Sequence, residues 1–284
     1  MPRARRLTII AGILAVSAMA TAAFFLRRPL LERWYLSRLD ADDRWERRAA
    51  IERLGELRSL RAVPRLLETL RYAAIVDQFP RGSPVERLHS EWLEHAGLRG
   101  PIVAALERVG PEAMPLVLEE VRQSLERPVD RETSDPLAPL ARHLLRAELM
   151  LVFGRWGSPS LPALLELLAD ERTWFDAASG LGVMGSEALP VLIEALESET
   201  ESVRCGAALA LGLIQPPPAE AVPELVRRLR EDAAPSVRRW SARAIGEVAP
   251  PFEAERILRR ALEDADEGVR QAAAAALKRV RERR

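Results

Sequence analysis

The chain has 284 residues, of which 48% are apolar but only 5% aromatic, so alanine, leucine and valine must supply most of the buried surface. Such a composition favours helices, because small and straight-chain residues lose little freedom there. The 42 basic and 42 acidic residues give a formal net charge of zero, which argues against a nucleic-acid-binding protein. A single cysteine, Cys205, excludes an internal disulfide bond and a metal site of several cysteines. The only lysine is Lys278 and asparagine is absent, a bias that indicates GC-rich coding and a bacterial origin.

The N-terminal segment Leu7–Leu26 has 20 residues without a charge, about the length of a helix that crosses the ~30 Å hydrocarbon layer. Apolar residues continue to Leu26, and Arg27-Arg28 followed by Trp34-Tyr35 resembles an interfacial anchor, which favours a retained transmembrane helix. The alternative is a cleaved signal peptide, with Ala18-Met19-Ala20 as its small-x-small cleavage site.

Arginines flank this segment on both sides, so the positive-inside rule is nearly balanced. A short basic amino tail usually stays in the cytoplasm, and we therefore expect an extracytoplasmic repeat domain, or an exported protein if the segment is cleaved. The chain is divided into residues 1–28 as anchor or signal segment, 29–41 as juxtamembrane linker and 42–284 as repeat domain.

Beyond Asp42 the chain repeats itself. Three copies of the dipeptide Val-Arg are each followed at fixed spacing by a pair of small residues and then, in the first two of these copies, by a glycine. The three copies are Val203-Arg204 with Ala207-Ala208 and Gly212, Val237-Arg238 with Ser241-Ala242 and Gly246, and Val269-Arg270 with Ala273-Ala274 and Lys278. Ala177-Ala178 with Leu181-Gly182 fits the same frame, and Phe153-Gly154 fits it more loosely. Leu54-Gly55, preceded by Ala49-Ala50, begins the series. Small residues at these positions let neighbouring helices approach closely.

A second landmark follows each first helix. It is a proline preceded by small or apolar residues, as in Ala62-Val63-Pro64, Ala113-Met114-Pro115, Ser160-Leu161-Pro162, Ala188-Leu189-Pro190 and Ala221-Val222-Pro223. Proline is tolerated in the first turn of a helix, so it marks the start of a second helix. Each unit is therefore predicted to be a first helix, a short turn, a proline-opened second helix and an acidic loop.

The pattern V-R-x-x-A-A-x-A-L-G, then A-x-P-x-L, then D-x-x-x-V-R resembles the HEAT-like repeats first described in phycobilin lyases, most specifically over Thr173–Val280. The resemblance implies an all-α protein, an α-solenoid of HEAT-like helical hairpins in which neighbouring units complete one another's core. Proteins with similar repeats include bilin lyases, a di-iron hydroxylase, DNA-repair glycosylases and adaptors, so the resemblance leaves the function open. Ala74–Gly100 and Glu126–Pro139 interrupt the repeat.

The residues that could carry chemistry are few. The di-iron relatives bind metal through His-Glu dipeptides, whereas none of His89, His95 and His143 is followed by glutamate. Cys205 is expected to face water, because its repeat counterparts are Arg239 and Gln271, and no histidine lies nearby to activate it. The tryptophans share no repeat position, which argues against an aromatic platform for nucleic acid.

Arg204, Arg238 and Arg270 form a row at one repeat position. We interpret this row as a ladder in which each arginine binds carboxylates or carbonyls of acidic loops, and not as a track for an acidic ligand.

The sequence thus predicts a membrane-anchored, non-catalytic scaffold that binds a protein partner through a concave surface of second helices. We expect no catalytic, metal or cofactor site, no nucleic acid and no small-molecule substrate. The alternative is an accessory lyase or chaperone subunit that acts on a cofactor-bearing protein, which a pocket lined by His, Asp and Tyr would support. Only two tyrosines, Tyr35 and Tyr72, are present to form one.

Overall fold

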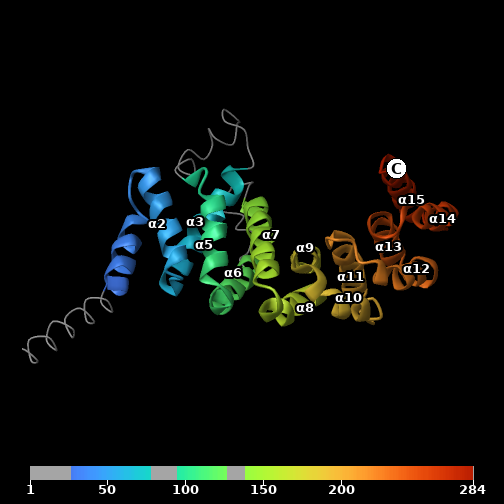
Figure 1. The fold of residues 1–284 in the computed structure, drawn as a ribbon, viewed down its shortest axis with the longest axis horizontal. Helices are drawn as coiled ribbons and strands as arrows, with labels where there is room; N and C mark the ends of the chain where they lie inside the picture. The colour runs from blue at the N-terminus through green and yellow to red at the C-terminus, as the bar shows by residue number, and fades with distance from the viewer. Residues whose placement is uncertain (1–26, 78–94, 127–137, 284) are drawn as a thin grey trace, which may run out of the picture. The chain divides into compact units, whose positions relative to one another are not determined.

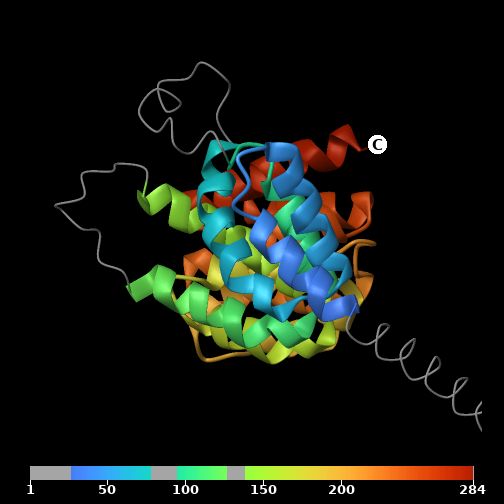
Figure 2. The ribbon, with the colours of Figure 1, turned by 90° about the vertical axis from the view of Figure 1, so that its left-hand side faces the viewer.

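A computed structural model describes residues 27–77, 95–126 and 138–283, and all regular structure within these ranges is helical (Figures 1 and 2). None of the helices in these ranges combines the length and the hydrophobicity needed to cross a membrane. The predicted anchor Leu7–Leu26, His89 and the interiors of both interruptions of the repeat lie outside the described residues.

The contacts divide the chain into two units, one ending at Val109 and one beginning at Gly110. In the first unit, residues 27–38 are helical and precede α2 (Arg44–Glu56), a 3₁₀ turn (Leu60–Ala62), α3 (Val63–Val76) and α5 (Arg99–Val109). Both α2 and α3 pack on α5, around fully buried side chains such as Leu54, Leu70 and Leu106.

The segment predicted as a juxtamembrane linker, 29–41, is thus helical as far as residue 38. This helix is fixed to the turn after α2, where Arg28 donates a hydrogen bond to the carbonyl of Leu57 at 2.7 Å and Ser59 donates one to Glu32. It therefore belongs structurally to the first hairpin rather than to a free linker.

The second unit contains repeated hairpins. Its first helices are α7 (Ala138–Trp156), α9 (Trp174–Met184), α11 (Glu201–Leu213), α13 (Pro235–Val248) and α15 (Glu267–Glu282). Its second helices are α6 (Met114–Glu126), α8 (Leu161–Ala169), α10 (Leu189–Ala195), α12 (Val222–Glu231) and α14 (Pro251–Ala261). Short 3₁₀ turns precede five second helices, namely Leu60–Ala62 before α3, Pro111–Ala113 before α6, Ser158–Ser160 before α8, Gly185–Glu187 before α10 and Ala219–Ala221 before α12.

The turn between the two helices of a hairpin has the predicted chemistry. In α3, α8, α10 and α12 the proline of the landmark stands in the first turn of the second helix. Gly157 after α7 and Gly185 after α9 have φ angles of 70° and 74°, which glycine adopts without steric cost. Proline at the start and glycine at the end therefore set the boundaries of these helices.

Successive first helices of the second unit pack directly on one another, from α7 through α9, α11 and α13 to α15. Figure 1 shows these helices along the inner side of the curve of this unit, with α8, α10, α12 and α14 along its outer side. The prediction that second helices form the concave surface is therefore wrong for this unit. The first helices take that place because their small residues allow the closer spacing.

The small residues lie where the repeat pattern predicts them. Ala208 and Ala242 are completely buried, whereas the second residue of the last pair, Ala274, is exposed. A Cβ atom on Gly212 would lie 3.2 Å from the Cα of Ala244, and one on Gly246 would lie 2.7 Å from the Cβ of Ala276. Both glycines thus mark contacts between one first helix and the next, as expected from their recurrence.

Candidate binding groove on the first helices

The first helices of the second unit can be aligned by their small pairs, so each repeat position has one residue per helix. Two tryptophans depart from this register. Trp174 takes the position of Arg204, Arg238 and Arg270, and Trp240 takes the position of Asp176, Gly206 and Ala272. Packing of the repeat does not demand a large ring at either position, so both residues are candidates for a role specific to this unit.

These two tryptophans meet. The ring centroids of Trp174 and Trp240 are 5.9 Å apart with an interplanar angle of 79°, and Phe175 lies 6.0 Å from Trp240. Both distances are in the range of favourable aromatic pairs. Trp174 and Phe175 belong to α9 and Trp240 to α13, whereas α11 lies between these helices, so the rings touch across α11. We call Trp174, Phe175 and Trp240 the aromatic cluster.

Gly206 of α11 makes room for the cluster. A Cβ atom at this position would lie 3.6 Å from Cε3 of Trp174 and 2.4 Å from Cδ1 of Leu168. Alternate first helices touch over their neighbour only on the inner side of a curve, which agrees with the concave arrangement of the first helices (Figure 1).

Next to the cluster lies a cavity of about 370 Å³, which we call the groove pocket. Helices α11, α13 and α15 line it, together with one residue of the loop after α11. The lining residues are Ala208, Leu209, Gly212, Leu213, Gln215, Trp240, Arg243, Ala244, Glu247 and Arg279. Large apolar side chains are exposed on the same helices, with Leu213 at 45%, and on α9, with Phe175 at 46% and Val183 at 44%. Its volume is within the range of about 300–1,000 Å³ that is typical of binding pockets.

The charges at the groove pocket do not balance. Arg243 places its guanidinium carbon 4.6 Å from the centre of the Trp240 ring, and within the described residues it has no hydrogen bond or ion pair. Glu247, the acidic residue of the lining, is bound by α15 instead, with Arg279 at 2.9 Å and the C-terminal Arg283 at 3.8 Å. One positive charge therefore remains on the pocket wall.

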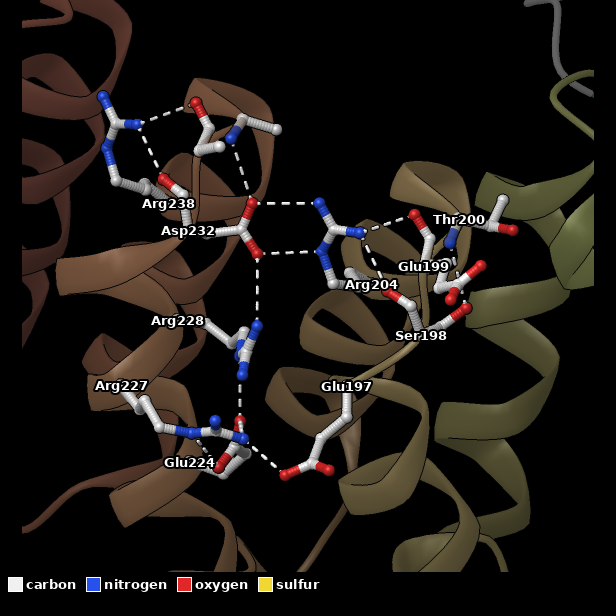
Figure 3. Close-up of polar contacts among 12 residues, drawn as sticks. Glu197, Ser198, Glu199, Thr200, Arg204, Glu224, Arg227, Arg228, Asp232 and Arg238 are labelled. Atoms are coloured by element: carbon white, nitrogen blue, oxygen red, sulfur yellow. Dashed lines mark hydrogen bonds and ion pairs between the residues drawn. The ribbon is translucent and has the colours of Figure 1, made fainter.

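The predicted arginine ladder is present (Figure 3). Arg204 donates two hydrogen bonds to the carboxylate of Asp232 at 2.8 and 3.0 Å, and two more to the carbonyls of Ser198 and Glu199. Arg238 repeats the arrangement with Asp264, at 2.9 Å for both bonds. Arg270 binds only carbonyls, those of Asp264 and Ala265, among the described residues. The row is structural, as predicted.

The ladder shifts the pKa values of its carboxylates. The hydrogen bonds from Arg238 are the main cause that lowers the pKa of Asp264, against a smaller opposing effect of burial. For Asp232 burial is the largest single influence and would raise the pKa, but hydrogen bonds from Arg204 and the amide of Ala234, with the charge of Arg228, together outweigh it. Both carboxylates are thus held in the ionised form that arginine requires.

The ladder stops where the aromatic cluster begins. The position of Asp232 and Asp264, six residues before each arginine, is Ser198 in the preceding loop. Ser198 keeps one function of these aspartates, because its hydroxyl accepts a hydrogen bond from the amide of Thr200, as Asp232 accepts one from Ala234. It has no carboxylate, and the helix before it offers Trp174 in place of an arginine. Between α9 and α11, therefore, both members of the arginine–aspartate pair are replaced, the arginine by Trp174 and the aspartate by Ser198.

The expectation that Cys205 faces water is wrong, because this side chain is only 3% exposed. Its repeat counterparts Phe175, Arg239 and Gln271 are all exposed. The thiol of Cys205 instead lies beside the hydroxyl of Ser236 on α13. Burial raises the pKa of the Cys205 thiol, so the thiolate that a nucleophile requires is disfavoured.

The two histidines among the described residues have different surroundings. Nδ1 of His143 lies 3.7 Å from the carboxylate of Asp176, and Nε of Arg146 lies 3.6 Å from it. Asp176 is buried, and this burial raises its pKa in spite of the opposing influence of His143 and Arg146. In the other unit the ring of His95 stacks on Tyr72 at 5.4 Å. Within the described ranges, no cluster of three or more His, Cys, Asp or Glu residues is arranged to hold a metal ion.

The first unit contains a separate cavity of about 260 Å³ between the loop 39–42, α2, α3 and the residues just before α5. Its lining includes Tyr72 and His95 with Asp40, Asp42 and Arg65. This is a pocket of His, Asp and Tyr, the kind that would support the alternative function. The sequence did not place these residues together, because His95 lies within the interruption Ala74–Gly100 and Tyr72 lies just before it.

The residues of the groove were not recognised from the sequence. Trp174 and Trp240 were counted among tryptophans without a common repeat position, and Arg243 was not singled out. The sequence does contain one indication, since Trp174 and Trp240 differ from the residues at the same positions of the other repeats. This difference points to a binding site only once the first helices are known to pack side by side.

Two family models match the chain. The model described as HEAT repeats matches residues 161–245 and 222–284, and the model described as PBS lyase HEAT-like repeat matches residues 46–74. These ranges coincide with helical hairpins in both units. No curated protein matches the chain.

Several solved structures resemble it. Human deoxyhypusine hydroxylase is 22% identical, with 92% of this chain and 91% of that chain covered and a TM-score of 0.36. A designed armadillo repeat protein is 16% identical, with 87% and 98% covered and a TM-score of 0.33. An engineered protein is 18% identical, with 88% and 78% covered and a TM-score of 0.35. With TM-scores below 0.5, these likenesses support no statement about function.

Proposed function

Because this chain is a HEAT-repeat protein, we propose that it is a non-catalytic scaffold that binds a protein partner through the first helices of its second unit. The observation that carries this proposal is the aromatic cluster beside the groove pocket. Exposed aromatic side chains around a partly apolar pocket are the usual anchors of protein interfaces. The repeat supplies the extended surface that surrounds them.

The residues that could do chemistry support a binding role over catalysis. Cys205 is buried with a raised pKa, and His143 has a buried, arginine-paired carboxylate as its neighbour. The guanidinium groups of Arg204 and Arg238 are already bound to Asp232 and Asp264 in the ladder. What the groove offers to a ligand is apolar surface and one unpaired guanidinium.

A site-specific photo-crosslinker tests the location of the interface. Placed at Leu213 on α11, in the groove pocket, it should yield one discrete adduct in cells of the native host. Placed at Phe252 on α14, which is 82% exposed but lies on a second helix, it should not. Trp240→Ala should then weaken the adduct from Leu213. Equal adducts from both positions, or none from Leu213, would show that the partner binds elsewhere.

We further propose that Leu7–Leu26 anchors the protein in a membrane, with the repeat domain outside the cytoplasm. The support is the uncharged run of 20 residues between arginines. The protein should then remain in the membrane fraction after alkaline extraction, and its N-terminus should lie upstream of Ala20. A soluble product that begins near Thr21 would identify a signal peptide instead.

The cavity of the first unit favours a second candidate function, that of an accessory lyase or chaperone subunit. Tyr72, His95 and Asp40 around one cavity could hold a polar cofactor or its attachment segment. Protein purified from the native host should in that case carry a spectrally active ligand, and Tyr72→Phe should reduce its occupancy. A colourless protein with no bound small molecule by native mass spectrometry would argue against this role.

A further inference from the structure

The packing of the helices gives Arg243 no structural role. It is exposed, yet the ring of Trp240 holds its guanidinium in one place, so less side-chain entropy is lost when the group binds a ligand. Arg238 on the same helix already has a carboxylate, whereas Arg243 has none within the described part of the chain. An arginine that is positioned but unpaired can donate two parallel hydrogen bonds to a bidentate anion.

The nearest acid on the same helix is not available to it. Glu247 lies one turn further along α13, at the i+4 spacing that normally gives an ion pair. Arg279 and Arg283 of the last helical segment bind Glu247 instead, and Arg283 also donates to the carbonyls of Gly246 and Glu247. The contact between α13 and α15 therefore fixes Glu247 away from Arg243 and keeps the guanidinium open to the groove.

The surroundings of Arg243 restrict the anion. The lining of the groove pocket contains two cations and one anion, Arg243, Arg279 and Glu247, which leaves a single net positive charge. The rest of the wall is largely apolar or small, with Ala208, Gly212, Leu213 and Ala244. One positive charge matches a carboxylate better than a doubly charged phosphate, and the apolar wall requires apolar groups beside the anion.

We propose that the groove pocket binds a protein segment in which an Asp or Glu side chain stands next to large apolar residues. The carboxylate pairs with Arg243, and the apolar neighbours fill the space between Leu213 and the aromatic cluster. This inference rests on the proposed function and specifies the chemistry of the partner.

Selection from an unbiased library of displayed twelve-residue peptides tests the proposal with the full-length protein. The wild-type protein should enrich peptides with one acidic residue flanked by Leu, Val or Phe. Arg243→Glu should lose affinity for these peptides by about tenfold or more in fluorescence anisotropy. The same variant should enrich peptides with Lys or Arg at the former acidic position.

Arg239→Glu is the matched control. Arg239 is exposed on the same helix, one turn before Arg243, but does not line the groove pocket. Its reversal makes the same change in total charge and should leave peptide affinity within about twofold of wild type. Equal losses in both variants would mean that only overall charge matters, and would overturn the role of Arg243.

The variant Leu213→Arg distinguishes a wrong carboxylate assignment from a wrong location of the binding site. If Leu213→Arg abolishes peptide binding but Arg243→Glu does not, the groove binds protein and the carboxylate assignment is wrong. If neither variant changes binding, or if no peptide is enriched, the groove is not a peptide-binding site and both proposals fail. Competition by millimolar inorganic phosphate at constant ionic strength would assign Arg243 to a phosphate and overturn the carboxylate.

Discussion

Arg238 and Arg270 occupy the same repeat position but make different bonds. Both donate to two carbonyls of the preceding acidic loop, and only Arg238 also has a carboxylate within the described residues. The comparison isolates the contribution of the bidentate pair from that of the loop carbonyls. It also bears on why lysine is so rare here, because an ammonium group cannot bind a carboxylate and two carbonyls through one planar fork.

Arg238→Lys should therefore cost more stability than Arg270→Lys. Loss of a two-pronged, charge-assisted bond predicts a decrease of about 1–3 kcal/mol in the free energy of unfolding for Arg238→Lys. Arg270→Lys should cost less than about 1 kcal/mol, since only carbonyl bonds are affected. Urea denaturation followed by circular dichroism measures both, and equal losses would contradict the importance of the carboxylate.

The lowered pKa of Asp264 predicts the pH dependence of stability. The folded state favours the ionised carboxylate, so this stabilisation is present above the ordinary pKa of 3.8 and is lost as the pH falls through the folded value. Asp264→Asn should be less stable than wild type at pH 6, and the gap should narrow below about pH 4. Urea midpoints between pH 6 and 2.5 measure this gap. A stability gap that stays the same from pH 6 to pH 2.5 would contradict the role of the ionised carboxylate.

At the scale of the helix, close contacts between first helices depend on glycine to very different degrees. A Cβ atom on Gly154 of α7 would lie 2.2 Å from the carbonyl oxygen of Gly180 in α9, whereas one on Gly212 would lie 3.2 Å from Ala244. The first contact is between two backbones and cannot relax without moving a helix. The second requires a shift of only a few tenths of an ångström.

Gly154→Ala should accordingly destabilise the second unit by about 3 kcal/mol or more, at or beyond the upper end of ordinary overpacking. Gly212→Ala should change stability by less than about 1 kcal/mol, because the better helix propensity of alanine offsets a mild clash. Thermal melts of the two variants give the comparison. A tolerated Gly154→Ala would show that α7 and α9 are not held at the described distance.

The repeat pattern predicted the hairpins, their proline-opened second helices and the buried small pairs, because these features depend on local chemistry and on a fixed period. It did not predict which helix lines the concave side, since curvature depends on how closely successive helices pack. It also misplaced Cys205, which is buried, and did not predict the contact between Trp174 and Trp240. Contacts between alternate repeats are invisible to a pattern that compares each repeat with the next.

At the scale of the whole chain, the second unit contains the ladder, the aromatic cluster and the groove pocket within its own contacts. In a repeat protein, stability is roughly a sum over units and their nearest-neighbour interfaces, so a set of five stacked first helices should suffice. The binding activity proposed for the groove should therefore not require the first unit.

Residues 110–284 expressed alone should fold and unfold cooperatively in urea, with peptide affinity within about threefold of the full-length protein. Circular dichroism and anisotropy with a selected peptide measure the two properties, and the Leu213→Arg form of the same fragment serves as the non-binding control. A fragment that is well folded but does not bind would show that the first unit takes part in recognition.

The missing rung of the ladder has a mechanical consequence. Bidentate clamps join α11 to the loop before α13, and α13 to the loop before α15, but the joint between α9 and α11 is filled by Trp174 over Gly206. Aromatic rings slide and tilt with little loss of energy, whereas a two-pronged ion pair tolerates little displacement. We expect stiffness to be uneven along the unit, rigid towards α15 and compliant at the α9–α11 joint. Flexing at that single joint would then move Trp174 and Phe175 of α9 relative to the groove pocket, whose walls on α11, α13 and α15 are clamped together.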